Sequence, residues 1–206
     1  MRRWLFAKIY DPFMRGSEDA CLRQWRTELL ADVHGRVLEI GAGTGRSVSC
    51  YPSGVERLVL DEPDAHMRKQ LEARAAEREG VEVGAGAAER LEYPDASFDF
   101  VFSSLVLCSV PDLERSLAEI RRVLVPGGRL VFLEHVADDE RPDRLRWQQR
   151  LEPIWKHFAA GCHLTRRTHQ DIEAAGLRIE RLERESMRKA NPLTRRSIRG
   201  TAVKPG

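Results

Sequence analysis

A short apolar run leads into three closely spaced glycines, in the stretch RVLEIGAGTGRSV from Arg36 to Val48. Gly41, Gly43 and Gly45 stand two positions apart, and glycine lets the backbone come close to a ligand where a side chain would block it. Dinucleotide sites use Gly-x-Gly-x-x-Gly and hold a pyrophosphate at the following helix. Here the third glycine comes one residue early, and the alternative to a ligand site is a purely structural glycine corner between a strand and a helix.

Two acids follow at the end of the next apolar run, LVLDEPDAHM. Asp61 and Glu62 stand about where α/β nucleoside sites place the acid that accepts hydrogen bonds from both ribose hydroxyls. Either acid alone is also compatible with a solvated turn. The combination with the glycines favours a nucleoside site.

The surrounding pattern alternates strands with helices. Apolar strands are predicted at 36–40, 57–61, 81–83, 98–107 and 129–136, and helices at 64–79 and 112–125. Asp64 is the expected N-cap of the first of these helices, and Pro126-Gly127-Gly128 is expected to end the second. Residues 1–31 are predicted to be helical, and the tail is predicted to hold helices at 143–158 and 168–175 and strands at 177–184 and 197–203. This order predicts an α/β fold with a parallel sheet and helices on both faces.

Length, composition and charge favour some classes of protein and disfavour others. The 206 residues and 42% hydrophobic content fit one globular domain, and the net charge of +2 arises from mixed charges, which disfavours nucleic-acid binding. No apolar run reaches the roughly 18 residues of a membrane span. The cysteines are far apart and form no Cys-x-x-Cys pair, which argues against a zinc site and for reduced thiols in the cytoplasm. They are Cys21, Cys50, Cys108 and Cys162.

At this point the chain resembles the class I methyltransferases that use S-adenosylmethionine. The resemblance is carried by VLEIGAGTG (37–45), Glu62, AERLEYPDASFDFVFSSLVL (88–107) and VLVPGGRLVFLEHV (123–136), in family order. It implies a Rossmann-like sheet of seven strands, mainly parallel, whose last two strands form a reversed edge. It also implies S-adenosylmethionine as cofactor, S-adenosylhomocysteine as product and no metal.

The resemblance assigns residues to the parts of the cofactor. Gly41, Gly43 and Gly45 line it, Glu62 binds ribose with Asp61 as a variable neighbour, and Glu39 suits an ammonium and sulfonium. Ala88 and Glu89 lie beside adenine, and Ser103 and Leu105 beside the methionine part. The family often has Asp or Asn where this chain has Ala87, so adenine recognition is expected to rest on backbone groups and Glu89.

A narrower resemblance covers most of residues 35–204. LVLCSVPDL, FLEHV, RWQQRLEPIWKHFAAGCHLTRRT and IRGTAVK are similar to the branch that includes the animal alkyl-thiol S-methyltransferases. We therefore expect a single domain, 1–206, with an N-terminal helical lid (1–31), a cofactor-binding core (35–136) and an acceptor-shaping tail (137–206). The animal relatives carry an N-terminal membrane-anchoring segment, which this sequence is not expected to have. Quinone C-methyltransferases resemble the core but less of the tail.

The expected acceptor is a small thiol, which needs little help because thiols are partly ionised at neutral pH. His135, after the fifth strand, and His163 are the candidates for a base or substrate contact; structural hydrogen bonding is the alternative for His135. Arg166 is expected to pair with an acidic substrate or to brace its loop. Cys108 and Cys162 are expected to be core thiols.

Tyr10 lies in the leading helical segment, which often covers the cofactor in this superfamily. Its ring is expected either to shield the methyl group from water or to pack the helix onto the core together with Phe6, Ile9 and Phe13.

Other functions remain open. An O-, N- or C-methyltransferase of natural-product or quinone biosynthesis is the alternative enzyme, although SSLV after the fourth strand differs from the NPPY type of amino-group methyltransferases. A cofactor-binding module without catalysis is the alternative from another class. A nucleic-acid methyltransferase is disfavoured by the dispersed charges. The acceptor atom and the oligomeric state are left open by the sequence.

Overall fold

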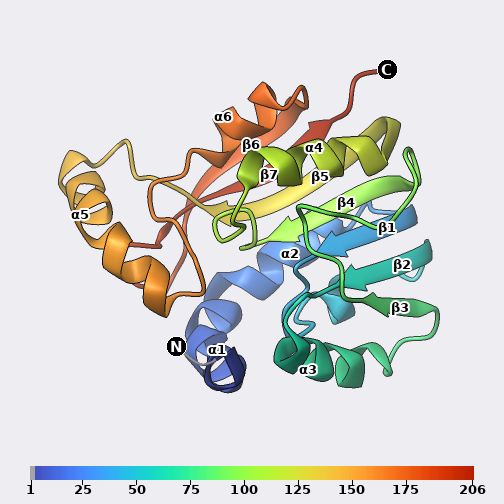
Figure 1. Ribbon diagram of the computed structural model, residues 1–206, viewed down its shortest axis with the longest axis horizontal. Coiled ribbons are helices and arrows are strands. Elements are labelled where there is room, and N and C mark those ends of the chain that lie inside the picture. Colours follow the sequence, from blue (N-terminus) through green and yellow to red (C-terminus); the bar gives the residue numbers. More distant parts are fainter. Residues whose placement is uncertain (1–2) are drawn as a thin grey trace.

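A seven-stranded sheet forms the centre of the protein, with the strand order β3-β2-β1-β4-β5-β7-β6 (Figure 1). The structure, a computed structural model, describes residues 3–206, so residues 1 and 2 of the expected lid lie outside the described residues. The strands are β1 (Gly35–Ile40), β2 (Val55–Asp61), β3 (Val81–Gly84), β4 (Phe98–Ser104), β5 (Leu124–His135), β6 (Arg178–Ser186) and β7 (Arg196–Val203).

The strands β1 to β5 pair in parallel, and β7 pairs antiparallel with both β5 and β6. The last two strands therefore form the antiparallel edge that the family resemblance implied, and β7 is the strand that runs against the others. The expected mainly parallel Rossmann-like sheet is confirmed.

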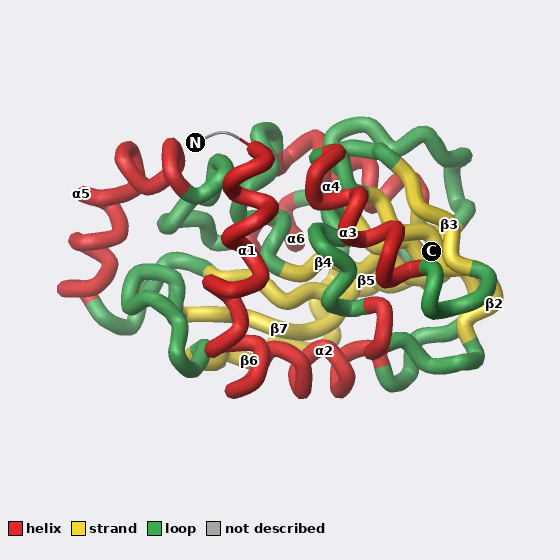
Figure 2. Tube along the Cα trace, turned by 90° about the horizontal axis from the view of Figure 1, so that it is seen from below, coloured by secondary structure: helices red, strands yellow, loops and turns green. Residues whose placement is uncertain are grey.

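Helices cover both faces of this sheet (Figure 1). They are α1 (Arg3–Ser17), a π-helix η1 (Glu18–Leu22), α2 (Arg23–Leu30), a short 3-10 turn η2 (Val48–Cys50), α3 (Ala65–Ala75), α4 (Leu113–Val123), α5 (Pro142–Phe158) and α6 (Thr168–Ala174). Figure 2 shows α1 crossing in front of the strands and continuing into α2. Among residues 3–206, no helix is long and apolar enough to cross a membrane.

Two apolar cores result, because successive side chains of a strand point to opposite faces of a sheet. Leu38 and Ile40 of β1 join one core with α4 and α6, while Val37 joins the other core with α2 and α3. In β5, Leu130 and Val131 divide in the same way. Strands that are buried on both faces read as the near-continuous apolar runs seen in the sequence.

The start of α3 agrees with the prediction, and the end of α4 differs from it. The Asp64 side chain accepts hydrogen bonds from the backbone N–H groups of His66 (2.9 Å) and Met67 (3.1 Å), so it is the predicted N-cap of α3. The helix α4 ends at Val123, ahead of the predicted Pro-Gly-Gly stop. Leu124 already pairs with Phe98 of β4, so pairing with the sheet ends the helix before the glycines do.

Candidate active site

A cleft opens at the carboxyl ends of β1 and β4, where parallel α/β sheets usually bind ligands. It holds about 360 Å³ of empty space, in part continuous with solvent. The glycine loop after β1, the end of β4 and the N-terminal helices contribute its walls. The lining residues are Tyr10, Glu18, Arg26, Glu39, Gly41, Ala42, Gly43, Thr44, Arg46, Ser47, Ser104 and Leu105.

The three glycines of the loop serve different purposes. All have positive φ angles, but a side chain at Gly41 would meet Val106 at 2.7 Å, and one at Gly45 would meet Leu71 at 2.9 Å. At Gly43 a Cβ would find only a backbone oxygen, 4.0 Å away. Gly43 therefore keeps the cleft itself open, whereas the other two glycines allow close packing within the protein.

The two adjacent acids after β2 point in different directions. Glu62 accepts hydrogen bonds from the backbone N–H groups of Gly43 (2.8 Å) and Asp64 (2.8 Å), so its carboxylate lies against the glycine loop. Asp61 accepts from the Tyr93 hydroxyl (3.0 Å) and the Gly86 N–H (3.3 Å), on the β3 side. Burial raises the pKa of both carboxyls.

Glu39 is buried at the end of β1 and lines the cleft. Its carboxylate accepts hydrogen bonds from the Ser47 hydroxyl (2.6 Å) and the Tyr51 hydroxyl (2.9 Å). Burial raises its pKa, and these hydrogen bonds oppose the rise. An acid so placed favours a cation in the cleft.

A buried ion pair that was not predicted from the sequence also contributes to the wall of the cleft. Arg26 of α2 binds both carboxylate oxygens of Glu18 in η1, and each side chain is 5% exposed. Both line the cleft. π-helical turns often occur at functional sites. In the sequence, the pair appears only as an acid and a base eight residues apart. This spacing matches no known motif, because it depends on the π-helical turn that begins at Glu18.

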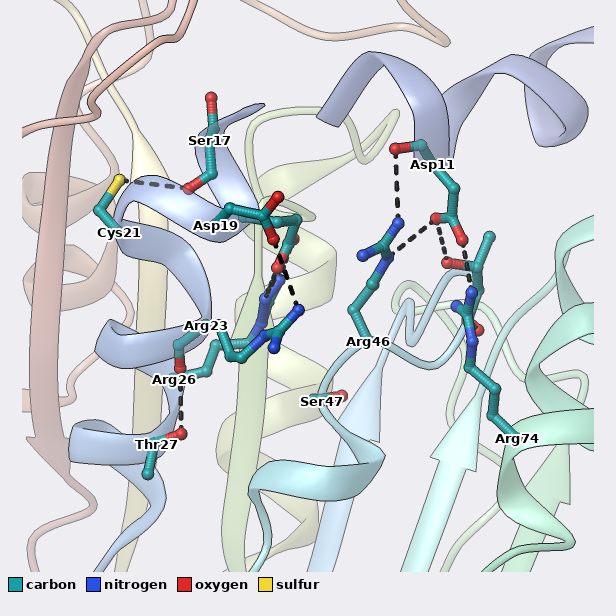
Figure 3. Close-up of polar contacts among 12 residues, drawn as sticks. Asp11, Ser17, Asp19, Cys21, Arg23, Arg26, Thr27, Arg46, Ser47 and Arg74 are labelled. Atoms are coloured by element: carbon teal, nitrogen blue, oxygen red, sulfur yellow. Dashed lines mark hydrogen bonds and ion pairs between the residues drawn. The ribbon is translucent and has the colours of Figure 1, made fainter. Parts of the chain in front are cut away.

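The helix α1 covers the glycine loop through Asp11 (Figure 3). The Asp11 carboxylate accepts hydrogen bonds from the Thr44 hydroxyl (2.7 Å), from Arg46 (3.1 Å) and from Arg74 of α3 (2.5 Å). Burial opposes its ionisation, but the hydrogen bonds from Arg74, Thr44 and Arg46 outweigh burial and hold the pKa of Asp11 below its usual range. We refer to Asp11, Thr44, Arg46 and Arg74 as the α1 clamp.

Tyr10, beside the clamp, lines the cleft, while its neighbours Ile9 and Phe13 are exposed. The alternative in which these apolar side chains pack α1 onto the core is therefore wrong for Ile9 and Phe13; the side chain of Phe6 lies outside the described residues. Burial raises the pKa of the Tyr10 phenol above its usual value.

Of the remaining predicted cofactor contacts, some line the cleft and others do not. Leu105 lines it, with a φ of 61°, but the fully buried Ser103 hydroxyl donates to Glu134 (2.7 Å), and Ser104 lines the cleft instead. Ala88 is buried in the core under α4, and Glu89 accepts a hydrogen bond from the Asp112 N–H at 3.4 Å. Their predicted contacts with adenine stay predictions.

His135, at the end of β5, lies in a buried cluster with two cysteines. Its Nε2 is 2.8 Å from the Cys162 Sγ, and the ligand atoms of Cys108, His135 and Cys162 lie within 4.8 Å of one another. A hydrogen bond from Cys108 and the neighbouring His135 hold the pKa of Cys162 below its usual range. The spacing argument against a zinc site considered only pairs close in sequence, and the fold brings together cysteines 54 residues apart.

His163 lies at the edge of this cluster and is partly exposed. Its Nδ1 is 3.2 Å from a Glu152 oxygen of α5, and its backbone N–H donates to the Cys108 carbonyl (2.8 Å). Arg166 donates to the carbonyls of Leu107 and Val110, so it braces the loop after β4, one of its two expected roles.

Comparison with known proteins gives the family. A model described as a methyltransferase domain matches residues 38–132. Thiol S-methyltransferase TMT1B of Rattus norvegicus is 40% identical over 71% of this chain and 62% of its own length. Thiol S-methyltransferase TMT1A of Homo sapiens is 37% identical over 82% of this chain and 70% of its own length.

The chain belongs to the class I methyltransferases, near their thiol S-methyltransferase branch. It spans less than two thirds of the length of the rat relative. Among solved structures, a methyltransferase in complex with the Haloferax volcanii Trm112 methyltransferase activator has a TM-score of 0.75 at 18% identity, covering all of this chain and 98% of that one. At this identity the likeness shows the fold alone. The family implies S-adenosylmethionine as cofactor.

Proposed function

We propose that this protein transfers a methyl group from S-adenosylmethionine to the sulfur of a small thiol. The observation that carries the proposal is the likeness to a thiol S-methyltransferase over 82% of the chain. That likeness extends well beyond residues 38–132, the part that matches methyltransferases in general. The segments after β5, which commonly vary with the acceptor in this superfamily, are therefore part of it.

The residues of the cleft fit the cofactor. Gly43 leaves room at the loop for the nucleoside. Glu62 lies beside it and has lone pairs left to accept hydrogen bonds from the ribose hydroxyls. Glu39 offers an anion for the ammonium and the sulfonium, and the Glu18–Arg26 pair lines the same cleft. When bound, S-adenosylmethionine supplies an electrophilic methyl group.

The chain's own residues then position and shield the acceptor. We propose that residues 3–31 act as a lid, held by the α1 clamp, with Tyr10 excluding water from the cleft. Holding nucleophile and methyl group in line supplies most of the rate enhancement expected for such a displacement. We further propose that residues 137–206 shape the acceptor pocket, with His135 and His163 on the acceptor side.

A panel of small thiols, phenols and amines with isotopically labelled cofactor tests the acceptor. We expect label to be recovered on thiol sulfur, with methylated phenols and amines at background. If a phenol, amine or carbon acid gains the methyl group while no thiol does, the proposal is wrong, and an O-, N- or C-methyltransferase takes its place. If no acceptor reacts although the cofactor binds, the chain is a binding module.

The two histidines are separated by substitution with glutamine. We expect His135→Gln to lower kcat/KM for a thiol by roughly a hundredfold or more, the scale of groups that take part in the chemical step. We expect His163→Gln to lower kcat/KM only a few-fold. The ring is partly exposed and its Nδ1 is 3.2 Å from a Glu152 oxygen, so we expect it to position the acceptor side without taking part in the chemical step. Equal, small losses in both variants would show that positioning alone carries the reaction.

A further inference from the structure

Three ligand-type side chains from three distant segments meet in the interior of the protein. Cys108 comes from the loop after β4, His135 from the end of β5, and Cys162 from the turn after α5. All three are buried. Their ligand atoms lie within 4.8 Å of one another, the spread expected of atoms that share one small cation.

The chemistry of this donor set selects a soft cation. Two thiolates and an imidazole are the ligands that zinc prefers, and two thiolates balance its charge in a buried site. The His135 Nδ1 is buried and has no hydrogen-bond partner among residues 3–206. The nitrogen that faces the cluster is Nε2, which lies 2.8 Å from the Cys162 Sγ, so Nε2 is the ring atom placed to bind the shared cation.

The protein fixes the segments that carry these ligands. The buried Glu134 carboxylate accepts hydrogen bonds from the Ser103 hydroxyl and from the backbone N–H groups of Val106, Leu107 and Cys108. The Cys108 carbonyl in turn accepts the His163 N–H, which joins the loop after β4 to the turn that holds Cys162. Such outer hydrogen bonds are typical of sites that hold ligands at fixed positions.

The ligand count leaves one position open. Among the described residues, the group that could hold a cation contains three members, and a tetrahedral cation takes four ligands. Sites with three protein ligands and one open position are the catalytic kind.

The loop after β4 links the cleft to the cluster. Leu105 lines the cleft three residues before Cys108.

We propose that Cys108, His135 and Cys162 bind a zinc-like cation whose fourth ligand is the sulfur of the acceptor thiol. The cation site stands on the geometry alone; the fourth ligand rests on the proposed function. The thiol loses its S–H proton to solvent on binding. Its sulfur forms a bond to the methyl carbon while the bond from that carbon to the sulfonium sulfur breaks, and the electron pair stays on the cofactor sulfur.

Zinc titration of the full chain tests the site without any turnover. The protein is stripped with chelator, kept reduced with a phosphine in place of a thiol, titrated with Zn²⁺ alone and measured for bound zinc. We expect about one zinc per chain, retained in Cys50→Ser, a matched change at a buried cysteine outside the cluster. Cys108→Ser and Cys162→Ser are expected to bind at least tenfold more weakly.

The wild-type titration needs no variant to be decisive. If reduced wild-type protein binds no stoichiometric zinc, the proposal is overturned, and the cluster is a Cys–His ion pair with a neighbouring thiol. If folded Cys108→Ser and Cys162→Ser variants bind zinc as tightly as wild type, the ligands are wrong. Circular dichroism of each variant establishes that it is folded.

The fourth ligand is tested on cobalt-substituted protein by adding a small alkyl thiol without cofactor. We expect a gain in sulfur-to-cobalt charge-transfer absorption. An unchanged spectrum would overturn the fourth ligand and leave a structural cation. Methyl transfer is then measured on the same preparation. If the protein binds the cation but methylates only non-thiol acceptors, the proposed function is wrong. If metal-free protein methylates thiols as fast as the metal-loaded protein, the proposed role of the cation is wrong.

Discussion

Glu62 and Asp61 are neighbours in sequence with different surroundings, so their substitution separates binding from packing. We expect Glu62→Ala to weaken S-adenosylmethionine binding by about 1.5–3 kcal/mol, the scale of hydrogen bonds to charged groups, because its carboxylate lies on the glycine loop. Asp61→Ala is expected to weaken binding less, because Asp61 faces Tyr93. Calorimetric titration measures both, and the reverse order would place the ribose on Asp61.

Gly43 is the glycine whose side of the loop is open. We expect Gly43→Ala to weaken cofactor binding at least tenfold, because its Cβ enters the cleft. Gly80→Ala is the matched control: Gly80 also has a positive φ, of 75°, and open space around it, but lies in the turn after α3. Both variants carry the same backbone strain of about 1 kcal/mol, so unfolding experiments should find them similarly destabilised. Equal cofactor affinity in the two variants would contradict the assignment.

At the scale of the element, α1 depends on the α1 clamp. We expect Asp11→Asn to lower the free energy of unfolding by about 1–2 kcal/mol, because the partly buried hydrogen bonds to Arg46 and Arg74 lose their charge. Asp19→Asn is the control. Asp19 pairs with Arg23 at 3.5 Å with both side chains more than half exposed, and such surface pairs contribute under about 1 kcal/mol.

The same clamp predicts a pH dependence. The pKa of Asp11 is lowered in the folded protein, so its contribution to stability is complete above the unfolded value of about 3.9 and is lost as pH falls through the folded value. The stability difference between wild type and Asp11→Asn should therefore be constant near neutral pH and shrink below about pH 4. Denaturant unfolding at several pH values measures it; a difference that grows on acidification would show that the clamp is not ionic.

For the whole molecule, cofactor binding and folding are coupled. A ligand that binds only the folded state at one hundred times its dissociation constant stabilises that state by about 2.7 kcal/mol. We expect S-adenosylmethionine and S-adenosylhomocysteine each to raise the midpoint of thermal unfolding accordingly, since the cleft joins β1, β4 and the N-terminal helices. No shift with either compound at millimolar concentration would reject the cofactor.

Much of the fold follows from local pattern. The presence of strands β1 to β5, the α3 N-cap at Asp64 and the glycine loop each depend on residues within a few positions of one another, so periodicity and glycine spacing suffice to predict them. The ends of the strands were predicted less well: β4 ends at Ser104 and not at 107, because Leu105 has a positive φ, and β5 begins at Leu124 and not at 129. The end of α4 was misplaced because Leu124 joins β5, a choice that depends on the distant strand β4.

The sequence by itself determined the methyltransferase scaffold, with Gly43 and Glu62 at the ends of neighbouring strands. Only the tertiary structure decided the α1 clamp, the Glu18–Arg26 pair and the cluster of Cys108 with His135 and Cys162. It also decided that Ser104, and not Ser103, lines the cleft. The reason is physical: parallel strands bring their carboxyl ends to one edge, so residues far apart in sequence meet there, and side-chain direction depends on strand rotation and on the segments packed above.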